Sequence, residues 1–237
     1  MDVRTLLLDI EGTTTPIDFV YKVLFPYARA HAREFLASRL DSEELKAEIA
    51  AFRRENSKDK LQGLDPPSLA DPPEPDSLVA YVHWLMDRDH KSTPLKALQG
   101  KIWEEGYQRG ELRGLVFEDV PRAFERWRAE GKQICIFSSG SVLAQKLLFS
   151  HTEAGDLTGY IDGYFDTNMG AKVEPASYTR IADALARDPG EILFVSDVVR
   201  ELDAARSGGM QTRLCIRPGN PPQAESSHGA IVSFDGI

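Results

Sequence analysis

The sequence predicts an α/β fold with a mostly parallel sheet and an all-helical insertion after the first strand. From residue 115 onward, short apolar runs alternate with helical patterns. This alternation is typical of a parallel sheet covered by helices on both faces. Residues 17–114 show helical periodicity instead, and a strand-like run at residues 6–8 precedes them. Because that first run belongs with the later strands, the helical block is an insertion into the sheet domain.

The opening apolar run, residues 6–8, ends at two acidic residues, Asp9 and Glu11, which are followed by Gly12 and three threonines. A short apolar run that ends in turn-forming residues is typical of a buried parallel strand. Ligands of open α/β sheets bind outside the carboxyl ends of the strands, so Asp9 and Glu11 should point into an active-site mouth. A carboxylate there can attack phosphorus if a divalent cation masks the charge repulsion. The alternative is that Asp9 only caps the loop after the strand.

The helical block contains helices on both sides of an irregular, proline-rich stretch at residues 64–76. We expect Pro26 to kink or restart the first helix, and Ser42 to be the N-cap of the next one. Thr93 is expected to cap the last helix, with Pro94 at its first helical position. Three residues of that helix share one face at i, i+4, i+8 spacing: Gln99, Trp103 and Tyr107. This stripe either covers a substrate or packs inside the block.

The second half of the chain supplies the remaining strands. They are expected at residues 134–137, 160–165, 192–195 and 212–216, with a last apolar piece at 230–232. Helical patterns separate them, and the first of these stops at Gly131, directly before a strand. We therefore expect a Rossmann-like core formed by residues 1–16 and 115–237, and a helical cap formed by residues 17–114.

Polar residues that could form a site lie at the ends of two of these strands and in one loop. Ser138 and Ser139 lie just before a helix, where hydroxyls and backbone N–H groups form an anion site, although an ordinary N-cap explains them equally well. Lys172 lies in a loop, where a lone lysine is usually solvated. Asp197 ends a strand opposite Asp9, so these two carboxylates could complete a magnesium site.

The order of these motifs resembles that of the haloacid dehalogenase superfamily of phosphatases. The matching residues are Asp9-Ile10-Glu11-Gly12-Thr13, Ser138, Lys172 and Asp197. The superfamily usually has aspartate at the second acidic position, where this chain has Glu11. The stretches DIEGTTTP, SSGS, GAKVEP and LQGKIW make the chain similar, along nearly its whole length, to the enolase-phosphatases of methionine salvage.

This resemblance implies a bifunctional enzyme that acts on 2,3-diketo-5-methylthiopentyl-1-phosphate. The enzyme would first enolise the diketone and then remove phosphate, leaving the acireductone 1,2-dihydroxy-3-keto-5-methylthiopentene. The resemblance also implies roles for individual residues. Asp9 would be the nucleophile and a Mg²⁺ ligand, Glu11 would bind Mg²⁺ through its backbone carbonyl and act as the acid/base group through its side chain, and Asp197 would be the remaining Mg²⁺ ligand. Ser138 and Ser139 would bind the phosphate or substrate, Lys172 would be a charge-balancing substrate ligand, and Glu201 would orient Lys172 or a metal-bound water. One Mg²⁺ is expected per subunit.

Two other functions remain open on the sequence alone. The chain could be a phosphatase of the same superfamily that acts on another small phosphate ester without enolisation. It could also be a catalytically inactive phosphate-binding module, but the intact Asp9, Lys172 and Asp197 disfavour this because a binding module needs no nucleophile. A dehalogenase is disfavoured because Glu11 and Asp197 supply a metal site that such chemistry does not use.

Composition limits which classes of partner and which cellular compartment are expected. The formal net charge of -9 disfavours nucleic acid and anionic membranes as partners. No apolar run approaches the roughly 18 residues of a membrane span, and the first residues do not read as a signal peptide. Cys135 and Cys215 lie in strand-like runs and are expected to be buried free thiols. We expect a cytoplasmic monomer with a small phosphorylated diketone as its substrate.

Overall fold

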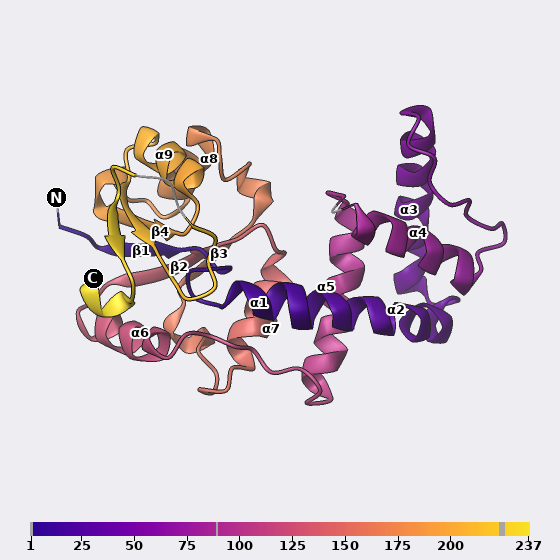
Figure 1. Cartoon of the computed structure of the whole chain (residues 1–237), viewed down its shortest axis with the longest axis horizontal. Helices are drawn as coiled ribbons and strands as arrows, with labels where there is room; N and C mark the ends of the chain where they lie inside the picture. Colours follow the sequence, from indigo (N-terminus) through magenta and orange to yellow (C-terminus); the bar gives the residue numbers. More distant parts are fainter. Residues whose placement is uncertain (1, 89, 223–225) are drawn as a thin grey trace. The chain divides into compact units, whose positions relative to one another are not determined.

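A computed structural model of the chain describes residues 2–88, 90–222 and 226–237 (Figure 1). The chain forms two compact units, one made of Met1–Tyr21 with Gly110–Ile237 and the other of Lys22–Arg109. We call them the sheet unit and the helical unit. The sequence predicts residues 17–114 for the helical block, whereas the helical unit of the structure begins at residue 22 and ends at residue 109. Its role as a cap stays a prediction.

The sheet unit is built on a six-stranded sheet with the strand order β3-β2-β1-β4-β5-β6, and among the described residues each strand runs parallel to its neighbours. The strands are β1 (Thr5–Leu8), β2 (Gln133–Phe137), β3 (Gly163–Phe165), β4 (Ile192–Ser196), β5 (Gln211–Cys215) and β6 (Gly229–Ile231). The central strand β1 pairs with β2 on one side and with β4 on the other. All four of its side chains are buried, which explains its continuous apolar sequence. The predicted α/β fold is confirmed.

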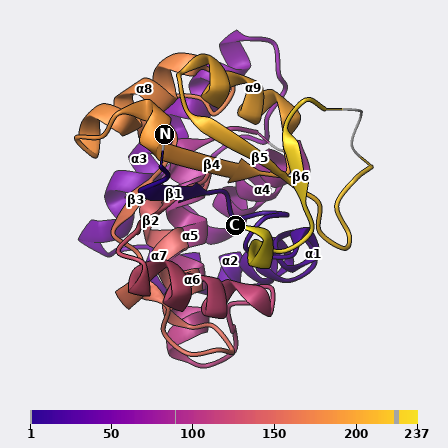
Figure 2. The ribbon, with the colours of Figure 1, turned by 90° about the vertical axis from the view of Figure 1, so that its left-hand side faces the viewer.

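Helices cover both faces of this sheet (Figure 2). The helices α6 (Asp119–Ala129) and α7 (Val142–Ser150) lie on one face, and α8 (Pro175–Ala184) and α9 (Val199–Ser207) lie on the other. Tyr178 of α8 packs edge-on against Phe137, with 5.7 Å between the ring centroids. On the opposite face, Phe124 of α6 lies 6.1 Å from Phe149 of α7. The sheet unit also contains the single turn of α1 (Ile17–Phe19).

The two cysteines lie inside this core as buried free thiols, as the sequence predicts. Burial raises the pKa of Cys135 to about 12 and that of Cys215 to about 11. Because the thiolate is the nucleophilic form, neither cysteine is a nucleophile at neutral pH.

The strand expected at residues 160–165 is shorter than predicted. A 3-10 turn occupies Thr158–Tyr160, and β3 begins only at Gly163. The intervening Asp162 pairs with Ile134 of β2 through both its backbone and its carboxylate. Its N–H donates to the carbonyl of Ile134 at 2.7 Å, and its Oδ2 accepts from the N–H of Ile134 at 2.9 Å. The same carboxylate accepts from Arg128 of α6 at 2.7 Å.

The helical unit contains α2 (Phe25–Arg39), α3 (Glu43–Leu61), α4 (Pro75–Asp87) and α5 (Thr93–Gln108), and a π-helical turn at Val20–Leu24 leads into it. Pro26 falls in the first turn of α2, directly after the π-helical turn, so α2 begins at this proline without a break in the helical conformation. Ser42 caps α3 as predicted, accepting from the N–H of Leu45 at 3.2 Å. The expected cap at Thr93 is wrong by one residue, because Ser92 accepts from the N–H of Leu95 at 3.1 Å.

The stripe on α5 is buried, with Trp103 only 8% exposed. The indole Nε1 of Trp103 donates to the backbone carbonyl of Leu24 at 2.8 Å, and its ring lies 6.2 Å from that of Phe25. Both partners belong to the helical unit. These contacts favour the packing interpretation of Trp103 over a contact with substrate.

Trp103→Phe should lower the free energy of unfolding by about 0.5–1.5 kcal/mol through the lost hydrogen bond to the Leu24 carbonyl, in addition to the packing lost with the larger ring. Urea denaturation followed by circular dichroism measures this loss. Trp84→Phe is the matched control, since Trp84 is also buried in the helical unit and no hydrogen bond of its indole is found among the described residues. A loss no larger for Trp103→Phe than for this control would contradict the argument.

Candidate active site

The site begins where β1 ends. Asp9 continues the pairing with β4, its N–H donating to the carbonyl of Val195 at 3.0 Å. Its side chain is buried, and Oδ1 accepts from the N–H of Ile10 at 2.7 Å. The hydroxyl of Ser196, the last residue of β4, lies 3.1 Å from Asp9 Oδ2 and can donate to it. The adjacent strand ends therefore fix both carboxylate oxygens of Asp9.

Lys172 reaches this carboxylate from the loop before α8. Its Nζ lies 2.6 Å from Asp9 Oδ1 and 2.6 Å from Glu201 Oε2. The rings of Phe137 and Phe194 lie 5.8 and 5.9 Å from the ammonium. Burial by itself would lower the pKa of Lys172, but the charges of Asp9 and Glu201 more than offset this effect and raise it. Lys172 is therefore a fixed cation, not a solvated loop lysine.

The α8 helix holds the loop that carries Lys172. The hydroxyl of Tyr178 donates to the carbonyl of Lys172 at 2.7 Å, and the hydroxyl of Ser177 donates to that of Ala171 at 2.7 Å. Gly170 just before them adopts φ 113°, a conformation that favours glycine. The position of the lysine is thus set by buried side chains of the helix that follows it.

Negative charge exceeds positive charge around Lys172. Burial, and then the charges of Asp9 and Glu201, raise the pKa of Asp197 to about 7. Burial and the charge of Asp9 also raise the pKa of Glu201, against the opposing effect of Lys172. Several carboxylates that destabilise one another in a buried site are what a divalent cation would stabilise.

The loop after β1 approaches Asp197 this closely only because residue 12 is glycine. A Cβ on Gly12 would stand 2.4 Å from Oδ2 of Asp197, and the φ of 72° favours glycine as well. Among the described residues, no group of three His, Cys, Asp or Glu side chains is arranged to hold a metal. The set expected from the sequence differs from such a group, because it has two carboxylates, Asp9 and Asp197, and the backbone carbonyl of Glu11. Oxygen ligands of this kind suit Mg²⁺.

Glu11 and Ser138 face each other near this loop. Burial and the Asp9 charge raise the pKa of Glu11, while Lys172 and a hydrogen bond with Ser138 oppose the shift. Ser138 is buried, and its hydroxyl also accepts from the N–H of Gly140 at 3.1 Å.

Ser138 and Ser139 are not the N-cap of the helix that follows them. Ser141 caps α7 instead, accepting from the N–H of Ala144 at 3.2 Å. This finding excludes the N-cap interpretation for both serines. Ser139 is exposed.

Some polar residues next to the site were not singled out from the sequence. They are Ser196, Arg217 and Asn220, with Asp119 behind them. Arg217 and Asn220 belong to an Arg-Pro-Gly-Asn turn after β5, and such a sequence predicts a turn but no chemistry.

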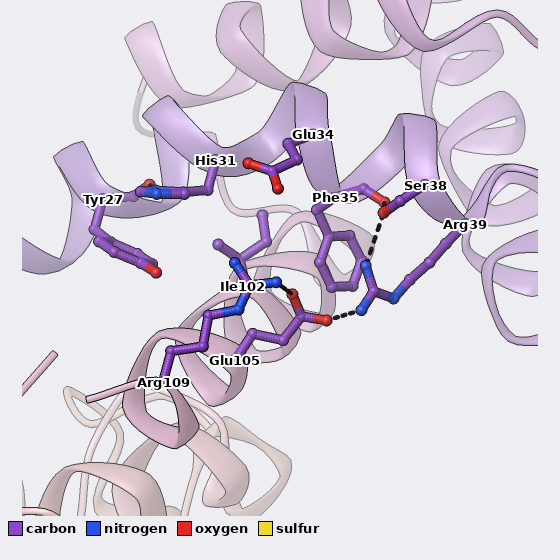
Figure 3. A pocket seen from close by; sticks show the side chains of 9 residues that line it. All are labelled: Tyr27, His31, Glu34, Phe35, Ser38, Arg39, Ile102, Glu105 and Arg109. Atoms are coloured by element: carbon purple, nitrogen blue, oxygen red, sulfur yellow. Dashed lines mark hydrogen bonds and ion pairs between the residues drawn. The ribbon is translucent and has the colours of Figure 1, made fainter. Parts of the chain in front are cut away.

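A small pocket within the helical unit is lined by residues of α2 and α5 and by Arg109. Figure 3 shows Arg39 of α2 and Arg109, which follows α5, both reaching Glu105. The rings of Tyr27 and His31 stack beside them, 3.9 Å apart. The cavity has a volume of about 20 Å³, enough for about one water molecule. Ion pairing between α2 and α5 is its evident role.

Comparison with known proteins assigns the family. A family model described as haloacid dehalogenase-like hydrolase matches residues 3–209. Enolase-phosphatase E1 of Synechococcus elongatus is 51% identical over 235 residues, which are 99% of this chain and 98% of that protein. The chain belongs to the enolase-phosphatase E1 family. The family resemblance predicted from the sequence motifs is confirmed.

Other similar proteins also span most of the chain. The protein of that name from Drosophila melanogaster is 45% identical over 94% of this chain and 86% of its own length. The crystal structure of the UTR4 protein from Saccharomyces cerevisiae is 34% identical, covers 100% of both chains and superposes with a TM-score of 0.82. Among the described helices, none combines the length and the hydropathy that a membrane span needs.

Proposed function

We propose that the chain is the enolase-phosphatase of methionine salvage. It converts 2,3-diketo-5-methylthiopentyl-1-phosphate into the acireductone 1,2-dihydroxy-3-keto-5-methylthiopentene and phosphate. The full-length relatives named enolase-phosphatase E1 support this reaction. The observation that carries it is the pairing of Lys172 Nζ with Asp9 Oδ1 at 2.6 Å, in a buried site at the carboxyl ends of β1 and β4.

Asp9 is the nucleophile of the phosphatase step. Its carboxylate attacks phosphorus, the P–O bond to the substrate breaks, and an aspartyl-phosphate forms. Lys172 stabilises negative charge on the transferring phosphoryl group, and Glu201 and Ser196 hold Lys172 and Asp9 in place. Glu11 gives a proton to the leaving oxygen and then takes one from the water that hydrolyses the intermediate. Ser138 and Ser139 bind the phosphate.

One Mg²⁺ per subunit would be held by Asp9, Asp197 and the backbone carbonyl of Glu11. When bound, it offsets the repulsion between these carboxylates and the anionic substrate. The cradle that Gly12 leaves beside Asp197 supports this assignment.

The enolase step precedes phosphate release. A base removes a proton from the carbon that bears the phosphate ester, and the neighbouring carbonyl oxygen gains a proton, so that an enol forms without any change in redox state. Glu11 or a residue of the predicted cap serves as this base. We also propose that the enzyme acts as a monomer in the cytoplasm, on this small phosphorylated substrate.

The two activities are tested together with the diketone phosphate. Ultraviolet absorbance follows enol formation while a phosphate assay follows release, and the proposal expects the absorbance change to come first. Phosphate release without any enol signal would favour a phosphatase acting on another small ester. Binding of phosphate without either signal would favour an inactive binding module.

Removing the metal should abolish phosphate release. Without a cation, the carboxylates of Asp9 and Asp197 repel an anionic substrate. The test is the initial rate in excess chelator, followed by titration with Mg²⁺, which should restore the activity. Full activity in the chelator would exclude the mechanism proposed above.

A further inference from the structure

Three backbone carbonyls of the loop after β1 accept hydrogen bonds from outside that loop. Asn220 Nδ2 donates to the carbonyl of Gly12 at 2.9 Å. Arg217 Nε donates to that of Thr13 at 3.1 Å, and the N–H of Phe117 donates to that of Thr14 at 3.0 Å. These three carbonyls follow directly after Glu11. Hydrogen bonds from outside the loop therefore hold three consecutive residues of the loop that carries the proposed nucleophile and acid/base group.

Of the two side chains, Asn220 and Arg217, Asn220 acts more directly on the proposed metal site. The carbonyl of Gly12 needs a donor, which requires the amide nitrogen of Asn220 to face it and leaves Oδ1 pointing elsewhere. Oδ1 lies 3.0 Å from the point where a Cβ of Gly12 would stand, and Asp197 Oδ2 lies 2.4 Å from the same point. No hydrogen-bond partner of this buried Oδ1 is found among the described residues. The amide thus lies between the Gly12 backbone and the edge of the proposed metal site.

Arg217 anchors the turn that presents Asn220. Its guanidinium makes two hydrogen bonds of 2.9 Å with the carboxylate of Asp119, and both side chains are buried. Asp119 also accepts from the N–H of Phe234 at 2.6 Å, and the rings of Phe117 and Phe234 lie 4.5 and 4.7 Å from the guanidinium. A buried ion pair is poor evidence for stability, because apolar residues of the same size would often do as well. The role of the ion pair here is to fix the orientation of the turn that carries Asn220.

We infer that Asn220 is a positioning residue for phosphoryl transfer: held by the turn that Arg217 anchors, it fixes the Gly12 carbonyl and thereby places Asp9, Glu11 and Asp197 around the metal. This inference rests on the proposed function of these three residues. A supporting group of this kind orients the ligands without touching the ion, and its loss typically costs 10–100-fold in metal affinity or activity.

The test compares Asn220→Ala with a matched control, Asn56→Ala. Asn56 is a buried asparagine of the helical unit whose Nδ2 donates to the carbonyl of Pro67 at 2.9 Å, so both variants remove an amide-to-backbone hydrogen bond. Thermal unfolding of the metal-free proteins measures the structural loss. Calorimetric titration with Mg²⁺ alone measures metal affinity, and steady-state assays separate kcat from KM.

Asn220→Ala should weaken Mg²⁺ binding at least about 10-fold and lower kcat at saturating Mg²⁺ at least about 10-fold. Asn56→Ala should lower the unfolding temperature while leaving the Mg²⁺ affinity and kcat within about two-fold of wild type. If Asn220→Ala changes only the unfolding temperature, as the control does, the inference is wrong.

Asn220→Leu decides the question if the alanine variant does not fold. Leucine has nearly the shape of asparagine but carries no donor for the carbonyl of Gly12 and adds no charge beside Asp197. A space-filling role predicts wild-type kcat for this variant, whereas a positioning role predicts a loss of at least about 10-fold. If wild-type protein does not bind Mg²⁺ or Asp9→Asn still releases phosphate, the proposed function itself fails; if both behave as proposed, only the role of Asn220 is at stake.

Discussion

Asp9→Asn should abolish phosphate release, lowering the rate by roughly 10⁴-fold or more, the scale of removing a nucleophile. The amide keeps the shape of the carboxylate. Its oxygen can still accept from the N–H of Ile10 and from Lys172, and the hydroxyl of Ser196 can rotate to accept from the new NH₂ group. The variant should therefore fold, but it has no carboxylate to attack phosphorus.

The same variant separates the two half-reactions. Enolisation needs a polarised carbonyl and a base but no nucleophile, so Asp9→Asn should still exchange the proton on the carbon that bears the ester. The measurement is deuterium incorporation from D₂O into the diketone phosphate, at Mg²⁺ concentrations that saturate the variant. Exchange at the uncatalysed rate, with metal and substrate still bound, would mean that Asp9 takes part in enolisation too.

Lys172→Met should lower kcat/KM at least about 10²-fold, the scale of losing one preorganised electrostatic group. Methionine keeps an apolar chain of similar length beside Phe137 and Phe194 but removes the charge between Asp9 and Glu201. Two buried carboxylates then face each other without their cation, so thermal stability should fall as well. Initial rates over a range of substrate concentrations give the change.

Lys146→Met is the control for this substitution. Lys146 is an exposed residue of α7 whose ammonium lies 5.6 Å from the ring of Tyr164. It should retain wild-type kcat/KM. A Lys172→Met enzyme within a few-fold of this control would show that Lys172 does not act on the transferring phosphoryl group.

The core strands and the residues at their ends were predictable because the information is local. An apolar run such as residues 6–8 is buried on both faces of a parallel sheet, and the first polar residue after it, Asp9, must lie at the carboxyl edge. The order of such strand ends then brings Asp9 and Asp197 to adjacent strands. Edge strands were less predictable, since β3 and β6 are each three residues long and carry little pattern.

The residues that support the site were not predictable, because their partners are distant in the sequence. Asn220 and Gly12 are separated by 208 positions, and Arg217 and Asp119 by 98. Neither pair leaves a periodic or composition signal. Lys172 presents the same difficulty: its loop sequence alone predicts a solvated side chain, and only the resemblance to a family gave it a role.

The central place of β1 has a consequence for how the enzyme is made. Its hydrogen-bonding partners come late: Thr5 pairs with Gln133 and Ile192, and Asp9 and Ser196 lie 187 positions apart. At ribosomal rates of about 5–20 residues per second, this stretch takes roughly 10–40 s to synthesise. The helical unit, Lys22–Arg109, is contiguous and its contacts are closer in sequence, so it can fold first. The nascent chain therefore carries its proposed nucleophile from the start, but the site that we propose is complete only once β4 and finally the turn that holds Asn220 have emerged.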